Sequence, residues 1–148
     1  MIRPYSIGMV ALLGGAAAVS EPPSNGPGRA TLTEAGAEAR KSWERRDFPA
    51  FVSAAAGNRV LVSLPNSPTS APLPPNQAAA LLSTYVQGTE EVSVTLQAAS
   101  EVDSTRGFVR LERDYRLVGV PADRKAMILL GYRRGREAWV LTEIRITP

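Results

Sequence analysis

Few residues of this 148-residue chain can act as acids, bases or nucleophiles, because the sequence contains no histidine and no cysteine. Thiol nucleophiles, disulfides, Cys/His zinc sites and serine–histidine arrangements are therefore excluded. A general acid or base has to be Asp, Glu, Tyr or Lys. The adjacent Asp114 and Tyr115 could supply both roles, but neighbours on a strand point to opposite faces of the sheet. The residue types thus favour a binding protein over an enzyme.

Arg113 is a polar residue at an otherwise apolar position. The residues that share its expected strand face are Val109, Leu111, Tyr115 and Leu117. One interpretation is an arginine inside the fold that binds an anion. The interpretation that we favour is an arginine at a sheet edge, whose aliphatic stem packs while its guanidinium reaches water.

Glu143 allows two similar interpretations. It follows Trp139 and Leu141 on one face of the last expected strand, which would make it a buried carboxylate base paired with Arg113. The alternative places Glu143 and Arg145 in an exposed row. The opposite face, buried in that case, holds Val140, Thr142, Ile144 and Ile146. The alternation of this segment favours the exposed row.

Our candidates for a ligand pocket are residues whose side chains could converge inside the fold: Trp43, Phe51, Tyr85, Arg113, Tyr115, Trp139 and Glu143. The aromatic members are more often part of an ordinary core. We assign no catalytic residue among the seven, because the strand register that would pair a carboxylate with a tyrosine is open. Acidic residues at expected turns lack metal-ligand spacing, and the sequence has no Gly-rich phosphate loop. We therefore expect no metal and no cofactor.

The charge balance argues against nucleic acid as a partner. Seventeen basic and fourteen acidic residues give a net charge of +3, and the two signs are interleaved along the C-terminal half rather than gathered in one run. The densest basic run, Arg133–Arg134–Gly135–Arg136, could contact an acidic partner. Between two apolar segments, a solvated hairpin turn is the simpler interpretation.

The first 20 residues predict a secretory signal peptide. Arg3 precedes an apolar stretch over 7–19, which is shorter than the roughly 18 residues that a membrane span needs. Small residues end this segment at Ser20, as before a cleavage site. Residues 21–30 are rich in proline and glycine and predict a linker. We expect an exported protein, periplasmic or extracellular, with no stable membrane span after signal removal and one folded domain over 31–148.

Caps and periodicity predict three helices: 33–46 after Thr31 or Thr33, 48–52 after Asp47, and 77–86 after Asn76, with Gly88 at its end. Alternating or continuous apolar residues predict strands over 59–64, 92–98, 109–117, 125–132 and 138–146. A proline-rich loop is expected over 65–75, and hairpin turns at Gly107, Pro121–Asp123 and Gly135. Helices followed by a run of strands indicate an α+β domain, with helices on one face of an antiparallel sheet.

This order is similar to the nuclear transport factor 2-like superfamily, also called cystatin-like. The similar segments are an opening helix and turn over 39–51, the start of a third helix over 74–82, and a final strand with a tryptophan over 137–146. The resemblance covers 31–148 and is closest to an uncharacterised branch of exported bacterial domains. It implies a curved antiparallel sheet that wraps around helices as a cone with a pocket inside. Relatives include ketosteroid isomerases, dehydratases, polyketide cyclases and binding or dimerisation modules, among which fold alone does not choose.

Our leading hypothesis is an exported, non-enzymatic domain that binds a small ligand or a protein partner through the cone or the sheet. One alternative is an isomerase- or dehydratase-like enzyme that uses Glu143 or Asp114 with Tyr115 or Tyr132. A third hypothesis is a homodimer built through the open face of the sheet.

Overall fold

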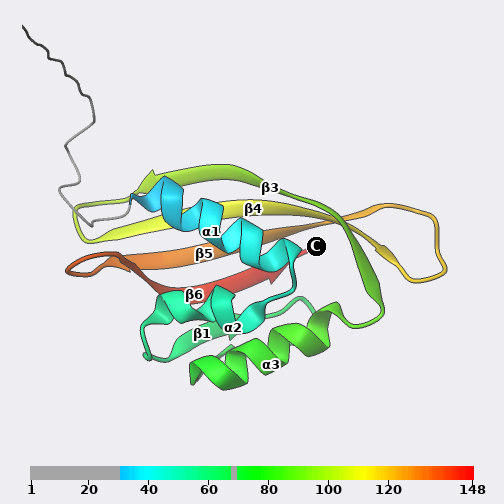
Figure 1. The fold of residues 1–148 in the computed structure, drawn as a ribbon, viewed down its shortest axis with the longest axis horizontal. Helices are drawn as coiled ribbons and strands as arrows, with labels where there is room; N and C mark the ends of the chain where they lie inside the picture. Colours follow the sequence, from blue (N-terminus) through cyan, green and yellow to red (C-terminus); the bar gives the residue numbers. More distant parts are fainter. Residues whose placement is uncertain (1–30, 68–69) are drawn as a thin grey trace, which may run out of the picture.

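Three α-helices lie against one side of a curved six-stranded sheet in the computed structural model, which describes residues 31–67 and 70–148 (Figure 1). The elements are α1 (Leu32–Glu44), α2 (Phe48–Val52), the 3-10 turn η2 (Ser53–Ala55), β1 (Val60–Ser63), β2 (Ala71–Leu73), α3 (Pro75–Val86), β3 (Thr89–Glu101), β4 (Arg106–Leu117), β5 (Arg124–Arg134) and β6 (Trp139–Thr147). The predicted α+β class is confirmed. The expected signal peptide (1–20) and linker (21–30) lie outside the described residues. None of the described helices is long and apolar enough to cross a membrane.

Two of the three helices begin at the N-cap residues predicted from the sequence. The Thr31 hydroxyl accepts a hydrogen bond from the Glu34 amide, and the Glu34 carboxylate accepts one from the Thr31 amide, so α1 begins with a capping box. The Asp47 carboxylate accepts from the Ala50 amide at the start of α2. The predicted cap at Asn76 is wrong. Helix α3 begins at Pro75, because a proline in the first turn needs no amide donor.

The sheet has the strand order β2-β1-β6-β5-β4-β3. Strands β3 to β6 form the predicted antiparallel meander. Strand β1 departs from the predicted antiparallel arrangement, because it pairs in parallel with β6. The expected loop over 65–75 contains one short strand, β2, which pairs with β1. Because helices cover the concave face, one side chain in two along each strand points into the core.

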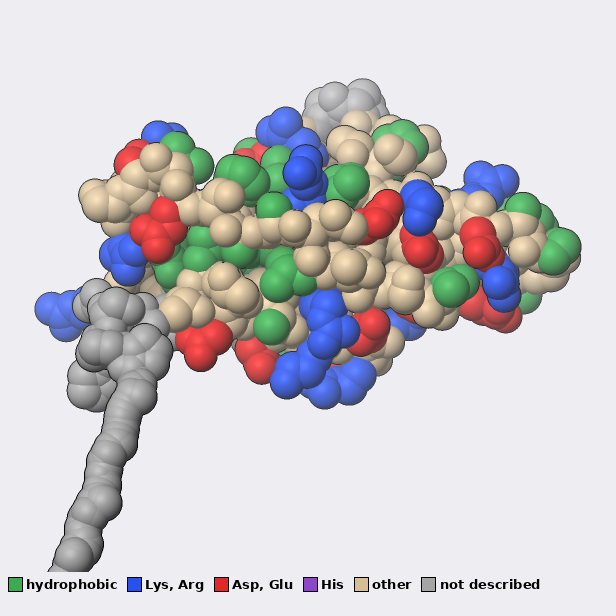
Figure 2. Space-filling view, turned by 90° about the horizontal axis from the view of Figure 1, so that it is seen from above, with side chains coloured by type: hydrophobic (Ala, Val, Ile, Leu, Met, Phe, Trp, Pro, Cys, Tyr) green, Lys and Arg blue, Asp and Glu red, His purple; other side chains and the backbone are tan. Residues whose placement is uncertain are grey.

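The core is built around α1, which crosses β3 and β4 (Figure 1). Trp43 is fully buried near the end of α1 and packs edge-to-face on Phe48 and Phe51 of α2, with ring centroids 5.1 and 5.4 Å away. Such edge-to-face pairs stabilise a core beyond the area that they bury. On the outer surface that includes α1 and β3, basic and acidic side chains are interleaved (Figure 2).

Gly107 is not at the hairpin turn where the sequence placed it. It lies inside β4 and faces α1, where an added Cβ atom would stand 2.7 Å from Leu32 Cδ2 and 3.1 Å from the Ser100 carbonyl oxygen. The absence of a side chain therefore allows α1 to approach the sheet closely. The turn itself is formed by 102–105.

We predict that Gly107→Ala destabilises the domain, because the new methyl group has to push Leu32 and the backbone of β3 apart. The expected loss in the free energy of unfolding is about 1–3 kcal/mol, the usual range for overpacking, and urea unfolding measures it. Ser104→Ala, in the turn beside it, is the control and should leave stability within about 0.5 kcal/mol. Equal stability of the two variants would contradict the close contact.

Candidate functional site

The charged centre of the fold is Arg113 on β4, whose side chain is 1% exposed. Its Nε donates to both carboxylate oxygens of Glu91 on β3, over 2.8 and 2.9 Å. Its Nη2 donates to the Thr89 hydroxyl over 2.7 Å. Because the guanidinium is buried, the pairing and the hydrogen bonds have to replace the hydration that it loses. The favoured prediction for Arg113, a guanidinium in water at a sheet edge, is wrong.

Three aromatic rings surround the same guanidinium. The Arg113 Cζ atom lies 4.1 Å from the ring centroid of Tyr115, 5.4 Å from that of Tyr85 on α3 and 5.8 Å from that of Trp43. These distances are within the range of cation–π attraction. Burial raises the pKa of Tyr85, and the neighbouring Arg113 charge opposes that rise. The structure thus brings together four of the seven predicted pocket residues, with an arginine occupying the space between the rings.

Glu91 is the counter-ion of Arg113 in this cluster, and the sequence analysis did not identify it. Its carboxylate is 10% exposed and also lies 3.4 Å from Nη2 of Arg46. Arg46 follows α1 with a φ of 56° and donates to the carbonyl oxygens of Val86 and Thr89. The carboxylate therefore has two cationic partners, and the loop after α1 is tied to the start of β3.

A β-bulge explains why Glu91 was missed. Between Glu91 and Ser93 the register of β3 against β4 shifts by one residue, so that Glu91 turns inward and Val92 outward. Val92, the first residue of the strand predicted over 92–98, is 45% exposed. The signal that could have found Glu91 is the need of a buried arginine for a counter-ion on the strand that pairs with its own.

Glu143 does not join this cluster. It lies on the opposite face of the sheet and accepts a hydrogen bond from Arg145 over 2.8 Å. The hypothesis of a Glu143–Arg113 pair is therefore wrong, and the exposed Glu143–Arg145 row is present. The predicted buried set for this strand is half correct, because Ile144 and Ile146 are buried whereas Val140 and Thr142 are not. A register shift between Gly131 and Tyr132, opposite this segment, separates the two halves of β6.

Asp114 and Tyr115 point to opposite faces, as predicted. Asp114 lies on the outer face and accepts a hydrogen bond from Lys125 over 2.8 Å. That bond, helped by the Lys125 charge, lowers the pKa of Asp114. An outward carboxylate in an ion pair cannot act as a base for a ligand inside the cone.

Phe51 and Trp139, the two remaining candidates, line a separate pocket of about 410 Å³ between α1, α2 and the sheet. We call it the α1–α2 pocket. Its walls are Ala35, Glu38, Ala39, Ser42, Arg45, Ala50, Phe51, Ser53, Ala54, Ala56, Tyr132, Ala138, Trp139 and Val140. The residues of α1 in this set recur at helical spacing, so one face of the helix forms a wall. The small alanine side chains leave the space open.

The polar groups of the α1–α2 pocket differ in burial. Ser42 is 6% exposed and Tyr132 is 3% exposed. Burial raises the pKa of the Tyr132 hydroxyl, which stays protonated at neutral pH. Glu38 is at the rim: its side chain is 71% exposed and lies 3.3 Å from Lys41. The pocket can therefore hold a mostly apolar molecule and offers a few neutral hydroxyl groups for orientation.

Trp43, Tyr85, Arg113 and Tyr115 are not part of the α1–α2 pocket. The indole Nε1 of Trp43 is the one buried side-chain polar atom of the described residues without a hydrogen-bond partner. Leaving such a donor unpaired costs about 1–3 kcal/mol. The position of Trp43 is thus determined by packing against α2 and by the Arg113 cation.

We predict that Arg113→Met destabilises the domain, because it leaves the Glu91 carboxylate without its main partner. The expected loss in the free energy of unfolding is about 3 kcal/mol, as for other broken buried pairs, measured by urea unfolding. Arg110→Met, three residues away on the exposed face, is the matched control and should change stability by less than about 0.5 kcal/mol. In the double variant Arg113→Met/Glu91→Gln, part of the lost stability should return.

We predict that Tyr132 makes the protein less stable at alkaline pH. In the unfolded chain this hydroxyl ionises near pH 10, whereas the folded state keeps the proton. Its contribution is fully present below that pH and is lost as pH rises toward the raised folded pKa. Urea unfolding between about pH 8 and pH 11 should show a smaller decline for Tyr132→Phe than for the parent protein. Identical declines would contradict the burial of this hydroxyl.

No family model matches this chain, and no curated protein matches it. Solved structures are similar over most of its length. A ketosteroid isomerase-like protein from Erwinia carotovora atroseptica matches 82% of this chain and 96% of its own, with 12% identity and a TM-score of 0.63. An NTF-2-like protein of unknown function from Shewanella oneidensis matches 79% of this chain and 96% of its own, with 11% identity and a TM-score of 0.57.

A third similar structure is a protein with a ketosteroid isomerase-like fold from Catenulispora acidiphila, solved in complex with trimethylamine. It matches 80% of this chain and 87% of its own, with 14% identity and a TM-score of 0.61. At these identities the likeness concerns the fold. The element order, the curved sheet and these similar structures together show that the described chain has the nuclear transport factor 2-like, or cystatin-like, fold.

Proposed function

We propose that this domain binds a small, largely apolar ligand in the α1–α2 pocket and does not transform it chemically. The observation that carries the proposal is the pocket itself, whose volume of about 410 Å³ is typical of small-molecule sites. Six alanines and Val140 form half of its wall, and Phe51, Tyr132 and Trp139 add aromatic rings. A planar or aliphatic molecule would gain affinity by removing this surface from water.

We propose binding without chemistry because the carboxylates of the domain are poorly placed to act as a general base on a ligand in the pocket. Its acidic residue, Glu38, lies at the rim in a solvated ion pair with Lys41. The carboxylate inside the cone, Glu91, is held by Arg113 and Arg46. A general base needs a lone pair within hydrogen-bond reach of the substrate. Glu91 is not part of the pocket wall, and Glu38 belongs to the wall only at its solvated rim.

The structure with trimethylamine supports the proposal as an example of this fold in complex with a small molecule. In the present chain the cation among the aromatic rings is its own Arg113. We therefore assign the ligand to the α1–α2 pocket and not to the aromatic cluster. Export of the protein remains a proposal that rests on residues 1–20.

Binding can be measured with N-phenyl-1-naphthylamine, an uncharged apolar dye whose fluorescence rises in an apolar site. We expect a saturable rise with one dye bound per chain. Ala35→Leu fills part of the pocket and should weaken binding about tenfold, since overpacking of 1–3 kcal/mol corresponds to such a factor.

Ala37→Leu is the matched control, because Ala37 is also half-buried in α1 but is not part of the pocket wall. It should bind the dye as the parent protein does. If the dye does not bind saturably, or if both variants weaken binding equally, the assignment of the ligand to this pocket is wrong.

A further inference from the structure

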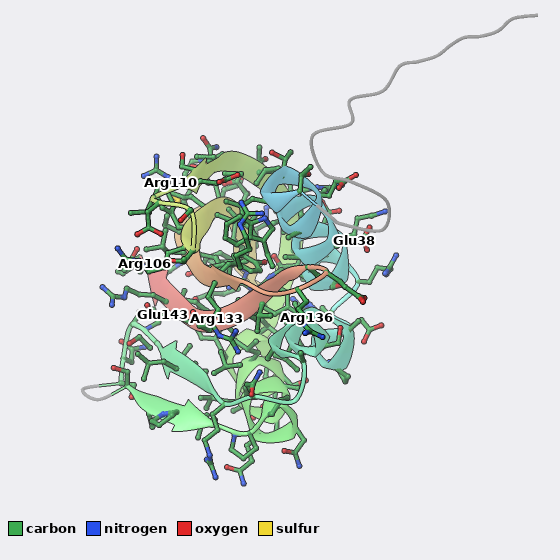
Figure 3. The ribbon with its side chains drawn as sticks, turned by 90° about the vertical axis from the view of Figure 1, so that its left-hand side faces the viewer. Glu38, Arg106, Arg110, Arg133, Arg136 and Glu143 are labelled. Carbon is green, nitrogen blue, oxygen red and sulfur yellow. The ribbon has the colours of Figure 1, made fainter. Side chains whose placement is uncertain are left out.

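Two arginines of like charge stand directly opposite each other on the outer face of the sheet. Arg106 on β4 and Arg133 on β5 are partners in the antiparallel register, and both are exposed. Like charges in this position repel and destabilise a strand pair. Figure 3 shows both arginines at one end of the sheet, together with Arg110 and Glu143, whereas Glu38 of α1 lies on the other side.

Some of the arginines near this pair have an acidic partner and others do not. Arg106 binds Asp103 over 2.9 Å, and Arg145 binds Glu143 over 2.8 Å. Hydrogen bonds from Thr105 and from Arg106 hold the pKa of Asp103 below its usual range, so that Asp103 remains a carboxylate. Among the described residues, neither Arg110 nor Arg133 has an acidic partner within ion-pair distance.

The other basic residues of the central outer face are paired. Lys125, at the far end of β5, lies 2.8 Å from Asp114 and 3.6 Å from Glu112. Arg116 pairs with Asp123 near the opposite hairpin. On the central outer face, the described arginines without an acidic partner are therefore Arg110 and Arg133, at the end of the sheet that also carries Arg106.

A shallow hollow of about 530 Å³ lies beside these arginines, with Arg106, Arg133, Thr142 and Glu143 in its wall. Gly131 forms part of its floor and leaves space where a side chain would contact Glu143. Phe108, the cross-strand neighbour of Gly131, is half-buried on the same face. The hollow thus has arginines and the Glu143 carboxylate in its wall, and Phe108 lies beside it on the same face.

We propose that this outer face binds an acidic peptide segment of a partner protein in an extended conformation. Arg106 and Arg110 are four residues apart on β4, which is about 13 Å along a strand. A single small anion is shorter than this span. An extended peptide with acidic side chains at positions i and i+4 has the same spacing and would place an apolar residue over Phe108 and Gly131.

The surroundings favour a peptide over a nucleic acid. A nucleic acid carries a phosphate on every nucleotide and prefers a continuous basic surface. Here Asp103 and Glu143 flank the arginines and would repel a continuous row of phosphates. A peptide can place neutral side chains beside these carboxylates. This inference concerns a different face from the α1–α2 pocket and does not depend on the proposed ligand.

The test uses a fluorescein-labelled peptide of eight residues, with glutamate at its second and sixth positions, phenylalanine at the fourth, and valine and threonine at the third and fifth. A second peptide has glutamine at both glutamate positions. Fluorescence anisotropy should show binding of the acidic peptide at low salt and weaker binding at high salt. Arg133→Glu and Arg110→Glu should each weaken it about tenfold, and the glutamine peptide should not bind.

Arg124→Glu is the matched control, because it makes the same charge change at the opposite end of β5 and should leave the affinity unchanged. If the acidic peptide does not bind, or if Arg124→Glu weakens binding as much as Arg133→Glu does, the proposal is wrong. Sedimentation equilibrium tests whether a second copy of the chain occupies this face instead. A dimer that dissociates in the Arg133→Glu variant would also overturn the proposal of a peptide partner.

Discussion

The ion pair between Arg113 and Glu91 is the constraint on which the interior of this fold depends. A guanidinium that is 1% exposed is stable only with a counter-ion and with donors satisfied, since an unpaired buried charge is strongly destabilising. Three features stabilise this guanidinium. The β3 bulge turns Glu91 inward, the Arg46 side chain connects the loop after α1 to β3, and three aromatic rings surround the charge. The interior is consequently a closed, charge-balanced cluster.

Because the interior is closed, the α1–α2 pocket lies outside it, in the gap between two helices. Trp43 packs toward α2 on one side and toward Arg113 on the other, so it separates the cluster from the α1–α2 pocket. Alanines along one face of α1 and in the segment after α2 keep that gap open. The same fold can therefore hold a small molecule without exposing its buried charges, and its outer face remains free to carry a different interaction.

Local features of the sequence predicted most of the fold. Asp47 and Thr31 cap helices as expected, and the alternation of β4 to β6 places the strands within a few residues. What could not be predicted depends on register between strands: the partner of Arg113, the direction of Glu91 and the burial of Val140 and Thr142. A bulge shifts every later side chain to the other face, and none of the three register shifts, two between β3 and β4 and one between β5 and β6, has a marker in the sequence. The α1–α2 pocket was not predicted, because alanines in a sequence indicate a helix and do not indicate that they line a cavity.

The most direct test of this account is the nuclear magnetic resonance signal of the Arg113 Nε–H group. Because that group donates to both oxygens of Glu91 inside a closed cluster, its proton should exchange slowly with water. Its shift should remain unchanged when an apolar ligand saturates the α1–α2 pocket. Rapid exchange with water, or a large change of this signal on ligand binding, would mean that the interior is open and that Arg113 is part of the ligand site.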